Sequence, residues 1–155
     1  MDWSHYRFRS AWELDAEPGT VYRVLERPDH YPDWWPQVRE VRQTGETTGV
    51  LRFRSVLPYD LTVTARSTRH DPESRILEVA MTGDLEGWVR WTIAGGDAPT
   101  RTRLLFEQEV VVRKALMRLL AIPCRPVFRA NHALMMRGGR LGLLARLARE
   151  AGHVV

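Results

Sequence analysis

Most of this chain alternates apolar and polar residues with a period of two, and near the C-terminus the period changes to that of a helix. The alternating segments lie between residues 38 and 112 and are separated by turn-forming residues such as Gly45 and Pro58. Their apolar positions are Leu51, Phe53, Leu61, Val63, Ala65, Leu77, Val79, Met81, Val89, Trp91, Ile93, Leu104, Phe106 and Val110. Strands with one apolar and one polar face are typical of an antiparallel meander that buries one side of its sheet.

Residues 4–14 form a further alternating segment ahead of the meander. Tyr6, Phe8, Trp12 and Leu14 share one face of it, while charged side chains occupy most of the other face. This pattern predicts a half-buried strand.

Two short helical segments are predicted between this strand and the meander. The first begins at residues 15–18, where a proline suits the first turn, and ends before Pro28, whose ring cannot follow another helical turn. The second is a helical turn within residues 31–36, which hold two prolines around Trp34 and Trp35. One of these tryptophans is expected to plug the core, and the other to line or gate a cavity.

A long helix is predicted from about residue 126 to residue 150. Its apolar stripe is expected to consist of Val127, Asn131, Leu134, Gly138, Leu141, Ala145 and Ala148, with Phe128, Met135 and Gly142 beside it. Its arginines lie mostly off that stripe. One strand, two short helices, a meander and a long amphipathic helix make an α+β domain in which the helix covers the sheet, and residues 1–155 are expected to form one such domain.

The composition is that of a single globular domain. The 155 residues are 44 % apolar and 27 % charged, and no segment approaches the roughly 20 consecutive apolar residues of a membrane span. The N-terminal residues contain no apolar run of the kind found in a secretory signal, and Cys124 is the single cysteine, which excludes an internal disulfide. We therefore expect a cytoplasmic protein.

Positive charge is concentrated toward the C-terminus. Nine basic residues and one acidic residue follow residue 112, so this part carries +8, although the whole chain carries only +4. Such a helix suits packing on an acidic body, and it also suits an anionic partner such as a nucleic acid, an anionic lipid or an acidic ligand. No aromatic residues are interleaved with the arginines for base stacking, and no helix-turn-helix pattern is visible, so a nucleic acid is not expected as a partner.

The order of these elements and three local strings resemble the START-like (SRPBCC) superfamily, and within it the bacterial polyketide cyclase/dehydrase and lipid-transport group. The strings are PGTVYRVLERPDHYPDWWPQV at residues 18–38, MTGDLEGWVRWTI at residues 81–93 and RPVFRANHALMMRGGRLGLLARL at residues 125–147. The resemblance implies a helix-grip fold, in which a curved antiparallel sheet of about seven strands surrounds the long C-terminal helix, with a cavity between them. It does not by itself assign a chemistry, because the family spans cyclases, transporters and coenzyme-binding proteins.

The cavity that this resemblance implies would have an almost wholly apolar wall. We expect its wall and its few polar groups to be formed by Trp35, Phe53, Ser55, Tyr59, Val63, Met81, Trp91, Phe106, Gln108, Asn131 and Met135. A mostly apolar pocket with a few polar groups is the usual form of a small-molecule site, so a hydrophobic small molecule is the expected partner. The alternative is that these side chains simply fill the core.

Two features of the long helix leave two interpretations open. Asn131 lies in the apolar stripe, where a buried amide needs hydrogen-bond partners, so it either binds a ligand or braces a loop or a strand end. Gly138, Gly139 and Gly142 each cost roughly 1 kcal/mol in a helix relative to alanine. These glycines indicate either close approach of the helix to the sheet or room for a ligand.

The sequence contains no signature of metal binding or of covalent catalysis. The five histidines are dispersed and match no zinc-ligand spacing, and no G-x-S-x-G motif is present. His132 lies at the border of the helix stripe, where a structural or solvated role is expected. Glu107 or Glu109 with Arg90 or Arg103 could perform acid–base chemistry, but their alternation predicts ion pairs on the outer face of the sheet. No catalytic residue, cofactor or metal is therefore assigned.

The sequence supports three hypotheses for function. The first is binding of a hydrophobic or polycyclic, lipid- or polyketide-like small molecule in the apolar cavity, with Gln108 and Asn131 orienting it. The second is a polyketide cyclase or dehydratase that positions its substrate and transfers protons, which requires a titratable group inside the cavity. The third is an interaction module that uses the basic C-terminal helix on an anionic partner. The ligand and the oligomeric state are left open.

Overall fold

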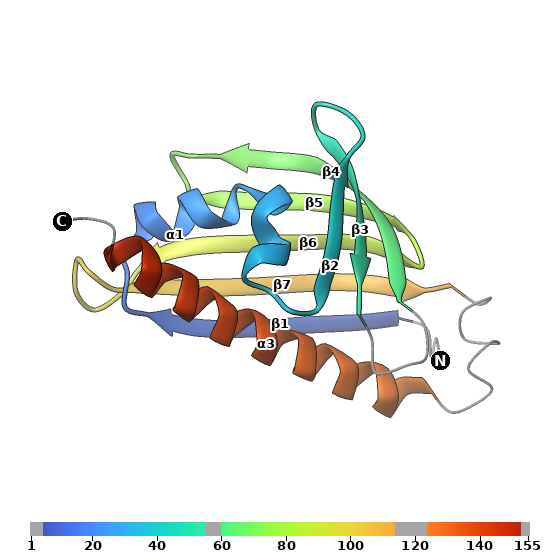
Figure 1. The fold of residues 1–155 in the computed structure, drawn as a ribbon. Coiled ribbons are helices and arrows are strands. Elements are labelled where there is room, and N and C mark those ends of the chain that lie inside the picture. Colours follow the sequence, from blue (N-terminus) through green and yellow to red (C-terminus); the bar gives the residue numbers. More distant parts are fainter. Residues whose placement is uncertain (1–4, 55–59, 114–123, 153–155) are drawn as a thin grey trace.

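The computed structural model describes residues 5–54, 60–113 and 124–152. Along the chain, its elements are β1 (His5–Leu14), α1 (Pro18–Leu25), the 3-10 helix η1 (Pro28–Asp33), β2 (Val38–Gln43), β3 (Thr48–Phe53), β4 (Leu61–Asp71), β5 (Ile76–Gly83), β6 (Leu85–Gly95), β7 (Thr102–Val112) and α3 (Cys124–Gly152). Figure 1 shows that the strands form one curved layer and that α3 runs along it. The predicted α+β architecture with a long C-terminal helix is confirmed.

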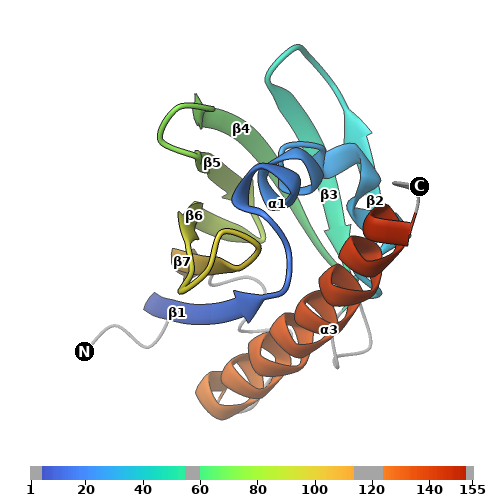
Figure 2. The ribbon, with the colours of Figure 1, turned by 90° about the vertical axis from the view of Figure 1, so that its left-hand side faces the viewer.

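The seven strands form a single antiparallel sheet in the order β1-β7-β6-β5-β4-β3-β2. Strands β2 to β7 are a meander, and β1 pairs with the far side of β7, so β1 and β2 are the two edges. In Figure 2 the sheet curls into an arc, and α3 lies across the open side of that arc. Because alternate residues of a strand point to opposite faces, the predicted apolar positions share the concave face.

Gly87 lets β6 and β7 approach each other closely. This residue has a φ of +154° in β6 and pairs with Met81 of β5 and Val110 of β7. A β-carbon at Gly87 would collide with the backbone carbonyl of Glu109 in β7. Glycine is therefore required where the neighbouring strand approaches this closely.

The segment between β1 and β2 closes one end of the sheet. Helix α1 begins with Pro18, whose missing amide hydrogen needs no partner in a first turn, and it buries Val21 and Leu25 completely. Tyr31 of η1 is also buried, and its hydroxyl donates a hydrogen bond to the carbonyl of Leu25 at 2.5 Å. This bond ties η1 to the end of α1.

The inner face of α3 differs from the stripe that the sequence predicts. Its buried residues are Phe128, Asn131, Met136, Gly139, Leu143 and Leu147. In contrast, Leu134 and Leu141 are 49 % and 57 % exposed, and Ala145 and Ala148 are exposed as well, so the prediction for these four residues is wrong. The reason is that α3 has apolar residues on two opposite faces, and spacing alone does not tell which face meets the sheet. In the part of the chain that the structure describes, no helix has the length and apolarity needed to cross a membrane.

The glycines of α3 receive residues 34–37, here called the tryptophan segment. A β-carbon on Gly139 would lie 2.6 Å from the indole of Trp35, and one on Gly142 would collide with the carbonyl oxygen of Trp34. The Nε1 atom of Trp35 also donates to the carbonyl of Met135 at 2.8 Å. Close approach is therefore the reason for these glycines, but the partner of the helix is the tryptophan segment and not the sheet.

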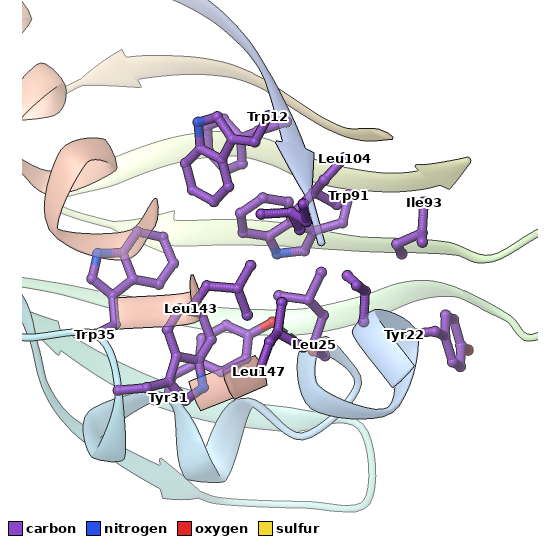
Figure 3. Close-up of a cluster of buried hydrophobic side chains, with 14 of the residues drawn as sticks. Trp12, Tyr22, Leu25, Tyr31, Trp35, Trp91, Ile93, Leu104, Leu143 and Leu147 are labelled. Carbon is purple, nitrogen blue, oxygen red and sulfur yellow. Dashed lines mark hydrogen bonds between the residues drawn. The ribbon is translucent and has the colours of Figure 1, made fainter. Parts of the chain in front are cut away.

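The core consists of two clusters of buried apolar side chains. The larger cluster includes Trp35, Trp91 and Leu143. Figure 3 shows its side chains converging from α1, η1, the sheet and α3. The smaller cluster includes Val63 and Phe128. Helix α3 contributes to both clusters, with Leu143 in the larger one and Phe128 in the smaller one.

Replacing Gly142 with alanine is expected to destabilise the protein, although alanine is the better helix former. The new β-carbon would meet the backbone of Trp34, and overpacking of this kind costs roughly 1–3 kcal/mol. The matched control is Gly138→Ala, because its β-carbon would meet only the end of the Gln37 side chain, which can move. For that variant we expect a free energy of unfolding that is unchanged or raised by up to about 1 kcal/mol. Urea unfolding measures both values, and equal stabilisation by the two substitutions would contradict the packing described here.

Candidate functional site

A cavity of about 630 Å³ lies between the concave face of the sheet and the N-terminal half of α3. Its lining includes Trp35 and Trp91 from the larger core cluster and Val63 and Phe128 from the smaller one. The cavity therefore separates the two clusters, and the core is not filled along its whole length. Volumes of this size are typical of small-molecule sites.

All seven strands contribute side chains to the wall of the cavity. The predicted residues that line it are Trp35, Phe53, Val63, Met81, Trp91, Phe106, Gln108, Asn131 and Met135. Ser55 and Tyr59, which were also predicted, lie outside the described residues. The period-two pattern thus identified inner-face positions on strands that are far apart in the sequence.

Several further lining residues were not predicted from the sequence. They include Tyr6 and Phe8 from β1, Tyr31 from η1 and Phe128 from α3. The alternation of residues 4–14 places Tyr6 and Phe8 on one apolar face, so that signal could have identified them. Predicting Phe128 would have required knowing which face of α3 turns toward the sheet. The proline-rich segment that holds Tyr31 has no periodicity from which an inward face could be assigned.

The two adjacent tryptophans have different roles. Both residues are 4 % exposed, and their rings stack with centroids 5.5 Å apart. Both residues belong to the larger core cluster, and Trp35 also lines the cavity. One core tryptophan and one cavity tryptophan is the arrangement expected from the sequence.

Three uncharged polar side chains face an otherwise apolar region of the cavity, and we call them the polar cluster. They are Gln108 from β7 and Asn131 and His132 from α3. The Nε2 atom of His132 lies 2.9 Å from Oε1 of Gln108, and the imidazole stacks on the ring of Phe8 with centroids 3.6 Å apart. Two members of the polar cluster, Gln108 and His132, are therefore in hydrogen-bond contact with each other at the wall of the cavity.

His132 is neutral at pH 7. Burial lowers the pKa of its imidazole to about 4, because the low-polarity surroundings disfavour the charged form. In the tautomer in which Nε2 donates to Oε1 of Gln108, Nδ1 is a hydrogen-bond acceptor. A structural or solvated histidine was expected here, and the structure places its side chain against the cavity.

Charged side chains border the cavity on the side of α1 and β4. They include Glu26, Arg27 and Arg69, which are exposed or partly exposed. The Nε2 atom of His70 in β4 lies 3.2 Å from a carboxylate oxygen of Glu26, which directly follows α1. The ring of His70 is also parallel to that of Tyr22, with centroids 6.1 Å apart. The cavity thus combines an uncharged polar cluster with a charged border.

The carboxylates considered for acid–base chemistry lie on the outer face of the sheet. Glu109 accepts a hydrogen bond from Arg7 at 3.2 Å, and Arg90 contacts Glu78 at 2.7 Å and Glu107 at 3.9 Å. These pairs join neighbouring strands, as the alternation predicts. Among the residues that the structure describes, no group of histidine, cysteine, aspartate and glutamate side chains could hold a metal ion.

Comparison with known proteins identifies one family and a set of similar folds. The family model described as polyketide cyclase / dehydrase and lipid transport matches residues 14–135. The Zhui aromatase/cyclase from Streptomyces sp. R1128 has a TM-score of 0.77 at 19 % identity, covering 95 % of this chain and 96 % of that one. A START superfamily protein from Mycobacterium smegmatis has a TM-score of 0.72 at 16 % identity, covering 92 % of this chain and 97 % of that one.

A longer protein contains the same fold. The di-domain ARO/CYC StfQ from the steffimycin biosynthetic pathway has a TM-score of 0.72 at 12 % identity, covering 97 % of this chain and 53 % of that one. At these identities the similarity to solved structures shows the fold alone. No curated protein matches the chain in sequence.

Acidification is expected to destabilise the protein through His132. An unfolded histidine has a pKa near 6.5, so between pH 6.5 and about 4 the unfolded state binds a proton that the folded state does not. The stability that His132 contributes is therefore fully present above pH 6.5 and is lost as the pH falls toward 4. Between about pH 7.5 and 5.5 we expect the free energy of unfolding to fall by about 1 kcal/mol, measured by urea unfolding.

Two variants test this assignment. His132→Gln should remove most of the pH dependence in this range, while His70→Gln, at an exposed position, should retain it. If the His132→Gln variant lost as much stability on acidification as the unmodified protein, the buried neutral imidazole would be the wrong explanation.

Proposed function

The chain belongs to the polyketide cyclase / dehydrase and lipid-transport family, and from this premise we propose that it binds an uncharged, hydrophobic small molecule in the cavity between the sheet and α3. The observation that carries the proposal is the cavity of about 630 Å³ between the two core clusters. Protein interiors are normally close-packed, so the side chains around an empty cavity lack some of their packing contacts. A ligand with an apolar body would restore those contacts.

The aromatic side chains of the wall favour a ligand with flat rings. The rings of Trp91 and Phe106 meet edge to face with their centroids 4.9 Å apart. The ring centroid of Trp35 lies 6.3 Å from that of Trp91. Aromatic rings held in this way provide large apolar surfaces and prefer stacked or edge-to-face contacts with other rings. A polycyclic or lipid-like body matches these surfaces.

The distribution of charge favours a ligand whose buried part is neutral. The charged residues among those lining the cavity are exposed or partly exposed, and the polar cluster of Gln108, Asn131 and His132 is uncharged at pH 7. An unpaired charge in such an environment would be strongly destabilised. A hydroxyl or a carbonyl group on the ligand would instead find a hydrogen-bond donor or acceptor in the polar cluster.

A cyclase or dehydratase activity is the second candidate, and His132 is the observation that favours it. This activity requires a titratable group beside the substrate, and the imidazole of His132 lines the cavity as a neutral base. In a dehydration, Nδ1 would accept a proton from a carbon next to a carbonyl and the protonated ring would return it to the departing hydroxyl group. Binding stays the first proposal because it needs only the cavity.

Filling the cavity is expected to abolish binding of a neutral hydrophobic dye such as Nile red. Ala65 lines the cavity on β4, so Ala65→Trp would occupy part of the space and should weaken dye binding by at least about tenfold in a fluorescence titration. Thr64→Trp is the matched control, because Thr64 is exposed on the outer face of the same strand. Equal affinity in the two variants, with both folded by circular dichroism, would place the dye elsewhere and contradict the proposal.

The two candidate functions differ in what His132 must do. With a short poly-β-keto thioester as substrate, the cyclase hypothesis predicts a cyclised or dehydrated product that is lost in the His132→Gln variant while Nile red affinity changes less than about threefold. Mass spectrometry of the reaction mixture detects the loss of water directly. If no product forms above the rate without protein, although the dye binds, the binding function stands and the enzymatic one is rejected.

A further inference from the structure

The outward side of α3 has an apolar stripe of its own. Leu134 and Leu141 are 49 % and 57 % exposed and lie seven residues apart, which is two helical turns or about 10.5 Å along the axis. The exposed residues Ala130, Ala133, Ala145 and Ala148 extend the stripe around them. In both ribbon views the other described elements lie on the inner side of α3 (Figures 1 and 2), so within the described chain this stripe has no covering element.

Arginines lie on the stripe, as Arg137 does between Leu134 and Leu141, and beside it. Among the described residues, none of the exposed Arg129, Arg137, Arg140 and Arg149 is neutralised by an ion pair. Arg146 differs, because it pairs with Glu150 at 3.0 Å. The sequence allowed the basic helix to pack on an acidic body. These four arginines form no ion pairs with such a body among the described residues.

We propose that this outward face of α3 docks on an anionic lipid surface, with the helix lying in the plane of the headgroups. Exposed leucines would insert beside the acyl chains, and the arginines on and beside the stripe would pair with lipid phosphates, as in interfacial amphipathic helices. The helix contains a single acidic residue, Glu150, and that residue is paired with Arg146, so little repulsion opposes approach to a negative surface. This inference goes beyond the proposed function and does not require the cavity to be occupied.

The same observations disfavour two other occupants. A second copy of the chain seated on this face would bring the unpaired arginines of both copies together, and like charges at an interface are repulsive. A nucleic acid would use the arginines but would leave the leucines exposed, since phosphate contacts require no apolar stripe. An anionic lipid surface uses both the charge and the apolar stripe.

Sedimentation with lipid vesicles tests the proposal on the full chain. We expect binding to vesicles of phosphatidylglycerol, weaker binding when salt is added, and little binding to vesicles of phosphatidylcholine. The double variant Arg137→Glu/Arg140→Glu should bind phosphatidylglycerol at least about 30-fold more weakly. Its matched control is Arg42→Glu/Arg66→Glu, which changes the net charge equally at exposed positions of the sheet and should bind more tightly than the helix variant.

A second variant separates insertion from charge. Leu141→Ser keeps every charge and should weaken binding several-fold, because it removes an exposed apolar side chain from the stripe. The proposal is overturned if phosphatidylglycerol vesicles do not bind the protein, or if both double variants lose affinity equally. It is also overturned if the protein forms a dimer that Leu141→Ser dissociates while vesicles remain unbound. Nile red titration of each variant reports on the cavity separately, so failure of docking and failure of ligand binding are distinguishable.

Discussion

The contact between the glycines of α3 and the tryptophan segment determines where this fold can be hollow. Gly139 and Gly142 let Trp34 and Trp35 approach the helix closely, and Leu143 and Leu147 bury the same half of α3 in the larger core cluster. The other half, which begins with Phe128, forms the wall of the cavity. The helix is thus anchored at one half and spans an open space with the other. Trp35 belongs to both parts, because its ring lies against Gly139 and the residue also lines the cavity.

Charge is arranged around that space by strand alternation. On the outer face, side chains such as Arg90, Glu78 and Glu107 form pairs across strands, and these side chains are partly exposed to water. On the inner face, the same alternation places apolar residues and the uncharged Gln108. A sheet with a one-residue shift in register would exchange these two faces, so the buried apolar side specifies the register strongly.

The inner faces of the strands could be predicted from the sequence, while the rotation of α3 could not. A strand offers only two faces, and one of them is plainly apolar, so residues as distant as Phe53 and Phe106 were assigned to the same wall. Helix α3 offers two apolar faces, and the predicted stripe followed the outward one through Leu134 and Leu141. Asn131 was still correctly predicted to line the cavity, because it lies on the boundary between the predicted stripe and the true inner face.

Two further features could not be predicted from the pattern of residues. Alternation describes a filled core and a hollow one equally well, so the cavity was implied only by the family resemblance. The position of His132 against Gln108 depends on the rotation of α3 and was therefore not accessible. For Ser55 and Tyr59, which lie outside the described residues, a place in the wall stays a prediction.

Occupation of the gap between the two core clusters by the proposed ligand would stabilise the native chain. A molecule that fills the gap binds the native chain and has no equivalent site on the unfolded one, so each occupied molecule is withdrawn from the unfolding equilibrium. At a free ligand concentration 100 times the Kd, the gain is about 2.7 kcal/mol, which is a large part of the margin by which most domains remain folded. Cells that make the ligand would therefore accumulate the protein, and cells that lack it would lose more of it to proteolysis.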